Sequence, residues 1–150
     1  TELAPTCGAM GYGLPAALAA KLRDPQRTVV CFAGDGCFLM YPQEIATAAA
    51  YGANLVVLVV NNGMYGTIRM HQEKRYPGRV SGTDIPSPDF VAMAQAFGCH
   101  AERVTATAEF MPALERALNS GKAAVIELMT DPEQVSTRTT VAALRAAKGA

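Results

Sequence analysis

The sequence predicts an α/β fold, a three-layer α/β/α sandwich in which helices cover both faces of a mostly parallel sheet. The run Asn54–Val60 is almost entirely apolar and rich in valine, which is typical of a strand buried on both faces. Strand patterns alternate with helix patterns along the chain, and this alternation implies parallel strands joined by right-handed crossovers. Half of the 150 residues are hydrophobic, which is enough for a core and excludes a disordered chain.

The first part of the chain contains two predicted helices and two predicted strands. Leu14–Leu22 has a leucine at every fourth position, and Pro15 in its first turn is compatible with a helix. Arg27–Ala33 predicts a buried strand. Pro42 begins a second helix that extends to about Tyr51, and Asn54–Val60 is the second strand.

The segment from Asn61 to Pro86 has no clean periodicity, although Ile68–Lys74 is compatible with a short helix. A connection of this length without its own pattern is usually functional or mobile. Ser87-Pro88-Asp89 then predicts the start of a helix, and Gly98 predicts its end.

Two further strands and one amphipathic helix follow. Cys99–Val104 and Ala123–Met129 predict the strands. Between them, Thr107 is expected to cap a helix. Its expected apolar face consists of Phe110, Met111, Leu114, Ala117 and Leu118. Residues 131–150 are expected to form a loosely held tail, with a short helix from Val141.

Composition excludes several classes of protein. Thirteen basic residues balance thirteen acidic ones, so the chain lacks the basic excess of a general nucleic-acid binder. The longest apolar run, Leu55–Val60, is far shorter than the roughly 20 residues of a membrane span. No Cys-x-x-Cys pair is present, which argues against zinc and iron–sulfur sites and favours a reduced, cytoplasmic protein. The start, Thr1-Glu2-Leu3, resembles no signal peptide and lacks an initiator methionine, which suggests a piece of a longer chain.

Polar, glycine-rich loops follow the first two predicted strands. The first is Gly34–Cys37 and the second is Asn61–Gly66. Each alone has a common turn composition, but in a parallel sheet both strands end at the same edge, where ligands bind. The Asp35 carboxylate and the neighbouring amide oxygens suit Mg²⁺ or Ca²⁺. The glycines beside Asp35 would let the N–H groups of Gly36 and Cys37 approach a phosphate.

These loops also carry a family resemblance. Gly34-Asp35-Gly36, followed by twenty-four residues and then Asn61-Asn62, resembles the thiamine-diphosphate signature of the superfamily of acetolactate synthase, pyruvate oxidase and benzoylformate decarboxylase. The stretch Cys7–Ala17 (CGAMGYGLPAA) resembles a second motif of acetolactate synthases. The resemblance covers about residues 5–130 and implies the thiamine-diphosphate-binding fold. Residues 1–150 would then be one pyrophosphate-binding domain, which in the family is usually the C-terminal third of a subunit.

The resemblance implies a role for each matching residue. Mg²⁺ would be bound by the Asp35 carboxylate, the Asn62 amide oxygen and the main-chain carbonyl of Met64. The Gly8 carbonyl would accept a hydrogen bond from the aminopyrimidine of thiamine diphosphate, and Met10 would wedge beneath the bent cofactor. The complete set implied to contact the cofactor is Gly8, Ala9, Met10, Gly34, Asp35, Gly36, Cys37, Asn62, Met64, Tyr65 and Gly66.

The family places the activating glutamate on a pyrimidine-binding domain of the same or a partner subunit. We find no sequence resembling that domain, and Glu44, in the first turn of a helix, does not have this role. No catalytic residue is therefore expected in this chain, which alone would be inactive. The resemblance implies a homodimer or homotetramer that decarboxylates or ligates small 2-oxo acids, acting on neither nucleic acid nor membrane.

The sequence departs from the family pattern in two places. Cys37 replaces the common serine after Gly-Asp-Gly, and His71 stands where biosynthetic acetolactate synthases carry a tryptophan. His71 could face the substrate or the solvent. The basic residues near it, which could meet an acidic substrate or simply be solvated, are Arg69, Lys74, Arg75 and Arg79.

Three alternatives remain open from sequence. Gly11–Ala16 matches a dinucleotide-binding G-x-G-x-x-A pattern, but the residues before Gly8 do not predict the strand that this fingerprint requires. The chain could also be a cofactor-binding domain without catalysis of its own, or a natural separate small subunit. The motifs do not distinguish carboligation, decarboxylation and oxidation, or name the 2-oxo acid.

Overall fold

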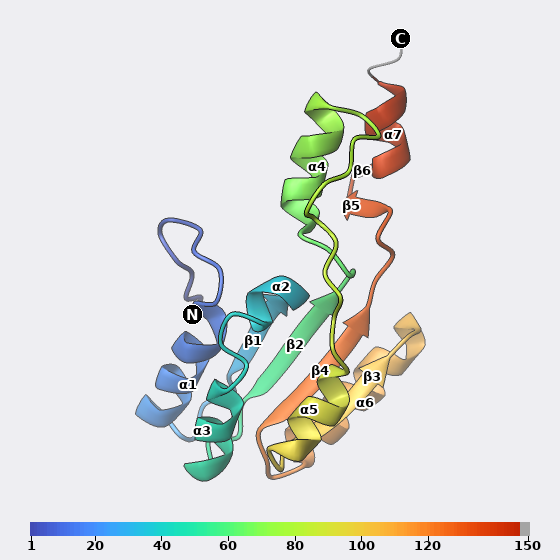
Figure 1. Cartoon of the computed structure of the whole chain (residues 1–150). Helices are drawn as coiled ribbons and strands as arrows, with labels where there is room; N and C mark the ends of the chain where they lie inside the picture. Colours follow the sequence, from blue (N-terminus) through green and yellow to red (C-terminus); the bar gives the residue numbers. More distant parts are fainter. Residues whose placement is uncertain (148–150) are drawn as a thin grey trace.

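A parallel four-stranded sheet forms the centre of the domain (Figure 1). The computed structural model describes residues 1–147. In spatial order the strands are β1 (Val30–Gly34), β2 (Val56–Asn61), β4 (Ala124–Met129) and β3 (His100–Val104). The four predicted strands are confirmed, with the first starting three residues and the second two residues later than predicted. Because all four are parallel, the loops after β1 and β2 leave the sheet at the same edge.

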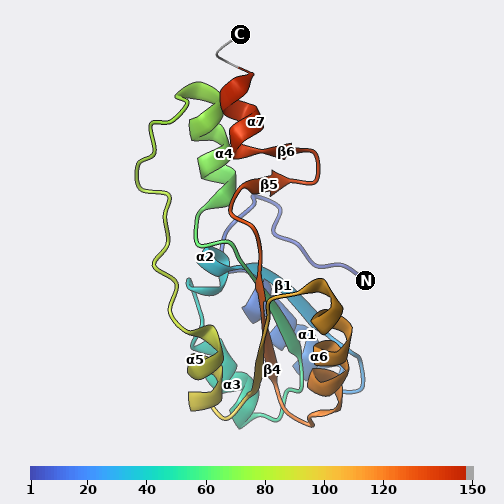
Figure 2. The ribbon, with the colours of Figure 1, turned by 90° about the vertical axis from the view of Figure 1, so that its right-hand side faces the viewer.

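Helices cover both faces of this sheet, which confirms the predicted three-layer architecture (Figure 2). One face packs against α1 (Gly13–Arg23), α3 (Glu44–Ala50) and α5 (Phe90–Ala96). The other face packs against α6 (Thr107–Asn119). A single turn, α2 (Asp35–Phe38), directly follows β1.

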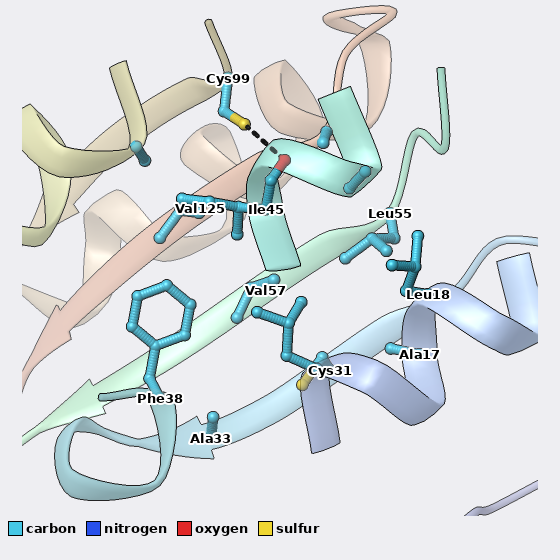
Figure 3. Close-up of a cluster of buried hydrophobic side chains, with 14 of the residues drawn as sticks. Ala17, Leu18, Cys31, Ala33, Phe38, Ile45, Leu55, Val57, Cys99 and Val125 are labelled. Atoms are coloured by element: carbon cyan, nitrogen blue, oxygen red, sulfur yellow. Dashed lines mark hydrogen bonds between the residues drawn. The ribbon is translucent and has the colours of Figure 1, made fainter. Parts of the chain in front are cut away.

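Alternation along the strands determines which side chains reach the site. Val57 and Val59 of β2 point into the larger cluster, together with Phe38 and Ile45 (Figure 3). Neighbouring strand residues face opposite sides of a sheet, so Asn61 at the end of β2 lies on this same face. By the same rule, Glu127 of β4 follows Val125 on the face covered by α5.

The α6 helix turns a different face toward the sheet than the sequence predicted. Ala113 and Ala117 are its buried residues, whereas Met111 and Leu118, which we expected on the apolar face, are exposed. The small alanines let the helix approach the sheet closely, so the large side chains lie at the margins. Thr107 is the first helical residue and not the cap; the Glu109 carboxylate instead accepts the N–H groups of Thr105 and Ala106.

The segment after β2 contains a longer helix than expected, and the C-terminal segment packs against it. Helix α4 (Gly66–Arg75) has ten residues. The hairpin β5 (Gln134–Ser136) and β6 (Thr139–Thr140) leads into α7 (Val141–Ala146), which lies beside α4 (Figures 1 and 2).

Side-chain contacts hold this C-terminal segment in place. Val141 is buried, and the guanidinium of Arg145 donates two hydrogen bonds to the carboxylate of Glu73, at 2.7 and 2.8 Å. The short helix expected from Val141 is present, and its partner on α4, 72 positions away, leaves no sign in the sequence pattern. The expectation of a loosely held tail stays a prediction. Residues 148–150 lie outside the described residues. Among the described helices, none has both the length and the apolar character needed to cross a membrane.

Candidate cofactor site

Asp35 lies at the centre of the candidate site. It is the first residue of α2, directly after β1, and is only 2% exposed. Its Oδ1 accepts the Gly36 N–H at 2.9 Å, and its Oδ2 accepts the Gly63 N–H at 2.9 Å and the Ser87 hydroxyl at 3.4 Å. Across residues 1–147, no cationic side chain forms an ion pair with Asp35. The site therefore contains a buried carboxyl group that is hydrogen-bonded to neutral donors, which is an arrangement suited to binding a cation.

The loop after β2 lies directly against Asp35. Gly63 adopts φ +68°, and its N–H is shared between Asp35 Oδ2 and Asn61 Oδ1, at 2.9 and 3.0 Å. Asn62 is half-buried, and its Oδ1 accepts the Met64 N–H at 3.2 Å in a tight side-chain turn. The structure thus brings the two predicted loops together at one edge of the sheet, and it concentrates carboxylate and amide oxygens there.

Two glycines permit this close approach. A Cβ atom on Gly36 would lie 2.6 Å from a ring carbon of Tyr65, and one on Gly66 would lie 2.9 Å from Asn62 Nδ2. Both distances are shorter than real side chains allow. Gly36 therefore allows the two loops to pack closely, because the Tyr65 ring would otherwise have to move. At Gly66 a side chain would displace the amide end of Asn62.

A strap formed by residues 79–87 returns from α4 and closes the site on one side. The Tyr65 N–H donates to the Thr83 carbonyl, and the Ile85 N–H donates to the Gly63 carbonyl, both at 2.8 Å. This pairing delivers Ser87, whose hydroxyl lies 3.4 Å from both Asp35 Oδ2 and Asn61 Oδ1. Sequence reasoning assigned Ser87 only to a helix start; in the structure Asp89 caps α5.

The N-terminal segment carries the remaining predicted contacts. Gly8 and Gly11 adopt φ +67° and +82°, and a Cβ on Gly11 would lie 2.7 Å from both Met40 Cβ and the Tyr41 ring. The segment therefore crosses just beyond α2. Met10 is 40% exposed, so it is not the plain core methionine that its type alone would suggest. The segment Thr1–Tyr12 contains no strand, which removes the support for a dinucleotide fingerprint.

A buried polar network behind the site was missed by sequence reasoning. Glu127 of β4, almost fully buried, accepts the Asn61 Nδ2–H and the Arg103 Nε–H, both at 2.7 Å. Arg103 also reaches Asp89 at 3.0 Å. The hydrogen bond to Glu127 raises the pKa of Arg103 further, so this guanidinium stays charged. The one signal in the sequence was a single glutamate within the otherwise apolar strand Ala123–Met129.

Two of the basic residues that could meet a substrate, Arg69 of α4 and Arg79 beyond its end, have partners within the chain. The Arg69 Nε–H donates to Glu73 at 2.9 Å, and its guanidinium also lies near Asp84. The hydrogen bonds from Arg145 are the largest cause that lowers the pKa of the buried Glu73 to about 2. Arg79 stacks over the Tyr76 ring at 5.6 Å. His71 is exposed on α4, and its contact with a substrate stays a prediction.

Comparison with known proteins agrees with this geometry. Residues 2–128 match the family model described as "Thiamine pyrophosphate enzyme, C-terminal TPP binding domain". The chain is 43% identical to the acetolactate synthase large subunit of Corynebacterium glutamicum over 115 residues, which cover 73% of this chain and 18% of that protein. It is 39% identical to the acetolactate synthase isozyme 2 large subunit of Escherichia coli over 114 residues, which cover 75% of this chain and 21% of that protein.

A solved structure shows the same fold. The thiamine diphosphate-dependent 4-hydroxybenzoylformate decarboxylase of Rhodococcus jostii RHA1 superposes with a TM-score of 0.79 at 34% identity. The match covers 85% of this chain and 24% of that chain. This chain therefore spans about a fifth to a quarter of the length of these similar proteins.

Proposed function

The chain belongs to the thiamine pyrophosphate enzyme family, as a C-terminal TPP-binding domain, and on that premise we propose that its two strand-end loops hold thiamine diphosphate through one Mg²⁺ ion. The ligands in this proposal are the Asp35 carboxylate, the Asn62 amide oxygen and the Met64 carbonyl. Magnesium prefers oxygen ligands and often takes only a few from the protein, leaving positions for phosphate oxygens and water.

The observation that carries this proposal is the environment of Asp35. A buried carboxylate with neutral donors and no ion pair among the described residues gains most from a cation. Asn62 belongs to the loop whose Gly63 N–H donates to that carboxylate, so one small ion could contact both loops after a modest side-chain rotation. In the described part of the chain, no three side chains of the His, Cys, Asp and Glu types group as a metal site. A site with one carboxylate and neutral oxygens is consistent with that finding.

We assign the diphosphate to the N–H groups around these loops. The donors are those of Gly36 and Cys37 at the start of α2, with Gly66 on the opposite loop. The Tyr65 N–H is bonded to the Thr83 carbonyl, so Tyr65 would help by holding that loop in place. Gly34, extended and open on its surface, leaves room beside them. The Gly36 N–H already donates to Asp35 Oδ1, so binding a metal at Asp35 would release this N–H toward a phosphate.

The N-terminal segment would hold the other end of the cofactor. We propose that the Gly8 carbonyl accepts a hydrogen bond from the aminopyrimidine, with Ala9 beside it. No atom lies within 4 Å of the position that a Cβ on Gly8 would take, so the backbone there is open to a ligand. The exposed Met10 would support the bent cofactor from below.

The whole protein, in this proposal, acts on small 2-oxo acids by decarboxylation or carboligation, as the names of its relatives suggest. Bound thiamine diphosphate supplies the carbanion-stabilising chemistry. In this proposal the described residues bind and orient the diphosphate, and the Mg²⁺ ion that they hold balances its charge. We assign the proton-transfer glutamate to a pyrimidine-binding domain in a homodimer or homotetramer. All four cysteines are free thiols, which supports a cytoplasmic location.

Calorimetry on the intact protein that carries this chain tests the proposal. Thiamine diphosphate with Mg²⁺ should bind, NADH should not, and Asp35→Ala should abolish Mg²⁺-dependent binding. Asp84→Ala is the matched control, since Asp84 is an exposed carboxylate on the adjacent strap. Unchanged cofactor affinity in Asp35→Ala would remove this assignment. Product analysis with pyruvate and benzoylformate then identifies the substrate and separates carboligation from decarboxylation.

A further inference from the structure

A continuous polar network crosses the whole sheet beneath the candidate metal site. It begins at Asp89 of the α5 cap, passes to Arg103 of β3 and then to Glu127 of β4. From there it reaches Asn61 at the end of β2, whose Oδ1 accepts the Gly63 N–H at 3.0 Å. Gly63 in turn donates to Asp35 after β1. The network therefore connects both edges of the sheet through groups that are hydrogen-bonded to one another.

Strand register explains why these residues meet. Arg103 and Glu127 are directly opposite each other in the pairing of β3 with β4. Asn61 is opposite Met129, so Glu127 is its diagonal neighbour on the same face, two residues earlier. Diagonal neighbours are within reach of long side chains. A glutamate at this position in β4 can thus contact the residue that precedes the proposed ligand Asn62.

The chemistry of Glu127 determines the orientation of Asn61. An ionised carboxylate only accepts hydrogen bonds, so the Asn61 amide must present its NH₂ group to Glu127. Its carbonyl oxygen then faces the opposite way, toward Gly63 and Ser87. Arg103 provides the balancing positive charge, without which this buried carboxylate would be costly.

We propose that Glu127, held by Arg103, is a positioning residue for the Mg²⁺ site: through Asn61 it fixes the Asn62–Met64 loop against Asp35. This inference rests on the proposed function of that loop as a metal ligand. Outer partners of metal ligands commonly change metal affinity by about 10- to 100-fold when they are replaced. Glu127 touches neither the proposed ligands nor the cofactor, so its effect must act through loop geometry.

A polarity swap tests the proposal in the intact protein. Glu127→Gln removes the acceptor-only group, and Asn61→Asp places two carboxylates face to face. The double variant restores both contacts at unchanged net charge, because the introduced glutamine can donate to the introduced aspartate and accept from Arg103. Each single variant should raise the Mg²⁺ concentration for half-maximal thiamine diphosphate binding at least about tenfold, and the swap should return it to within about threefold.

A readout without metal or cofactor separates positioning from added charge near the ion. Hydrogen exchange of the peptide 61–66 in the cofactor-free protein should become faster in each single variant and return toward the wild-type rate in the swap. Glu102→Gln is the matched control. Glu102 precedes Arg103 on β3 but faces the opposite side of the sheet, where its carboxylate contacts His100 and accepts from Arg116 of α6, so the Mg²⁺ dependence should be unchanged.

The outcomes distinguish this inference from the proposed function. A wild-type protein that binds no thiamine diphosphate with Mg²⁺ refutes the proposed function. A wild type that binds, with an unchanged Mg²⁺ dependence in Glu127→Gln or no recovery in the swap, overturns the positioning role. If Glu127→Gln does not fold, Arg103→Gln is tested in its place, because Arg103 is partly exposed. An increase of at least about threefold in the Mg²⁺ concentration for half-maximal thiamine diphosphate binding supports the positioning role, and an unchanged concentration overturns it.

Discussion

Replacing Gly36 with alanine should push apart the two loops of the candidate cofactor site. The new Cβ would lie 2.6 and 3.0 Å from two ring carbons of Tyr65 and 2.9 Å from Ile85 Cδ1. The end of Ile85 can rotate away. The Tyr65 ring has less freedom, because its own N–H is tied to the Thr83 carbonyl at 2.8 Å. Such overpacking costs about 1–3 kcal/mol, and alanine recovers up to about 1 kcal/mol through its helix propensity. We expect a net loss of about 1–2 kcal/mol.

Urea denaturation of the cofactor-free intact protein measures this loss, with Gly34→Ala as the control. Gly34 has φ −67° and ψ 159°, which any residue can adopt, and nothing lies within 4 Å of its Cβ position. Its substitution should change stability by less than about 0.5 kcal/mol. Gly36→Ala should in addition weaken Mg²⁺-dependent cofactor binding. Equal stability of the two variants would refute the argument from close loop packing.

Three further predictions concern other parts of the domain. Hydrogen bonds from Arg145 are the main cause that lowers the pKa of Glu73 to about 2. The ionised carboxylate therefore stabilises the folded state above pH 4.5, and this stability is lost as the pH falls toward 2. The free energy of unfolding of Glu73→Gln should therefore be lower by up to about 3 kcal/mol at pH 7, and it should depend less on pH below 4.5 when measured by urea denaturation. Equal pH dependence in the variant and the wild type would contradict this. Burial raises the pKa of Cys31 to about 11, so the exposed Cys7 should react with a maleimide long before Cys31, as peptide mapping would show. Ile126→Ala, at a fully buried position, should cost about 2–5 kcal/mol in thermal or urea denaturation, and a loss below about 1 kcal/mol would mean that the sheet repacks there.

Local patterns were sufficient to predict the sheet and the meeting of the two loops. The continuous apolar run of β2 and the alternation of helices and strands imply parallel strands, and parallel strands end at the same edge. This rule alone brings Asp35 near Asn62. The metal and cofactor roles of these residues were inferred from a family resemblance, and they stay proposals.

Long-range partners were not predictable, because they leave no periodic trace. Ser87 reaches Asp35 only because the strap pairs with Gly63 and Tyr65, far from it in sequence. Arg145 can donate to Glu73 because α7 packs against α4. Glu127 could most easily have been noticed in the sequence, because a single charged residue within an apolar strand needs a buried hydrogen-bonding or oppositely charged partner.

The edge strand β1 has a practical consequence for laboratory work. β1 pairs with β2 alone among the described strands, and Phe32 in its middle is 74% exposed. It points to the same face of the sheet as α6, in a part of that face that α6 does not cover. An exposed aromatic side chain beside an unpaired strand edge favours pairing with strands of other chains. Preparations restricted to these 150 residues should therefore self-associate at high concentration, and Phe32→Ser or a lysine nearby would be a sensible first step toward keeping them in solution.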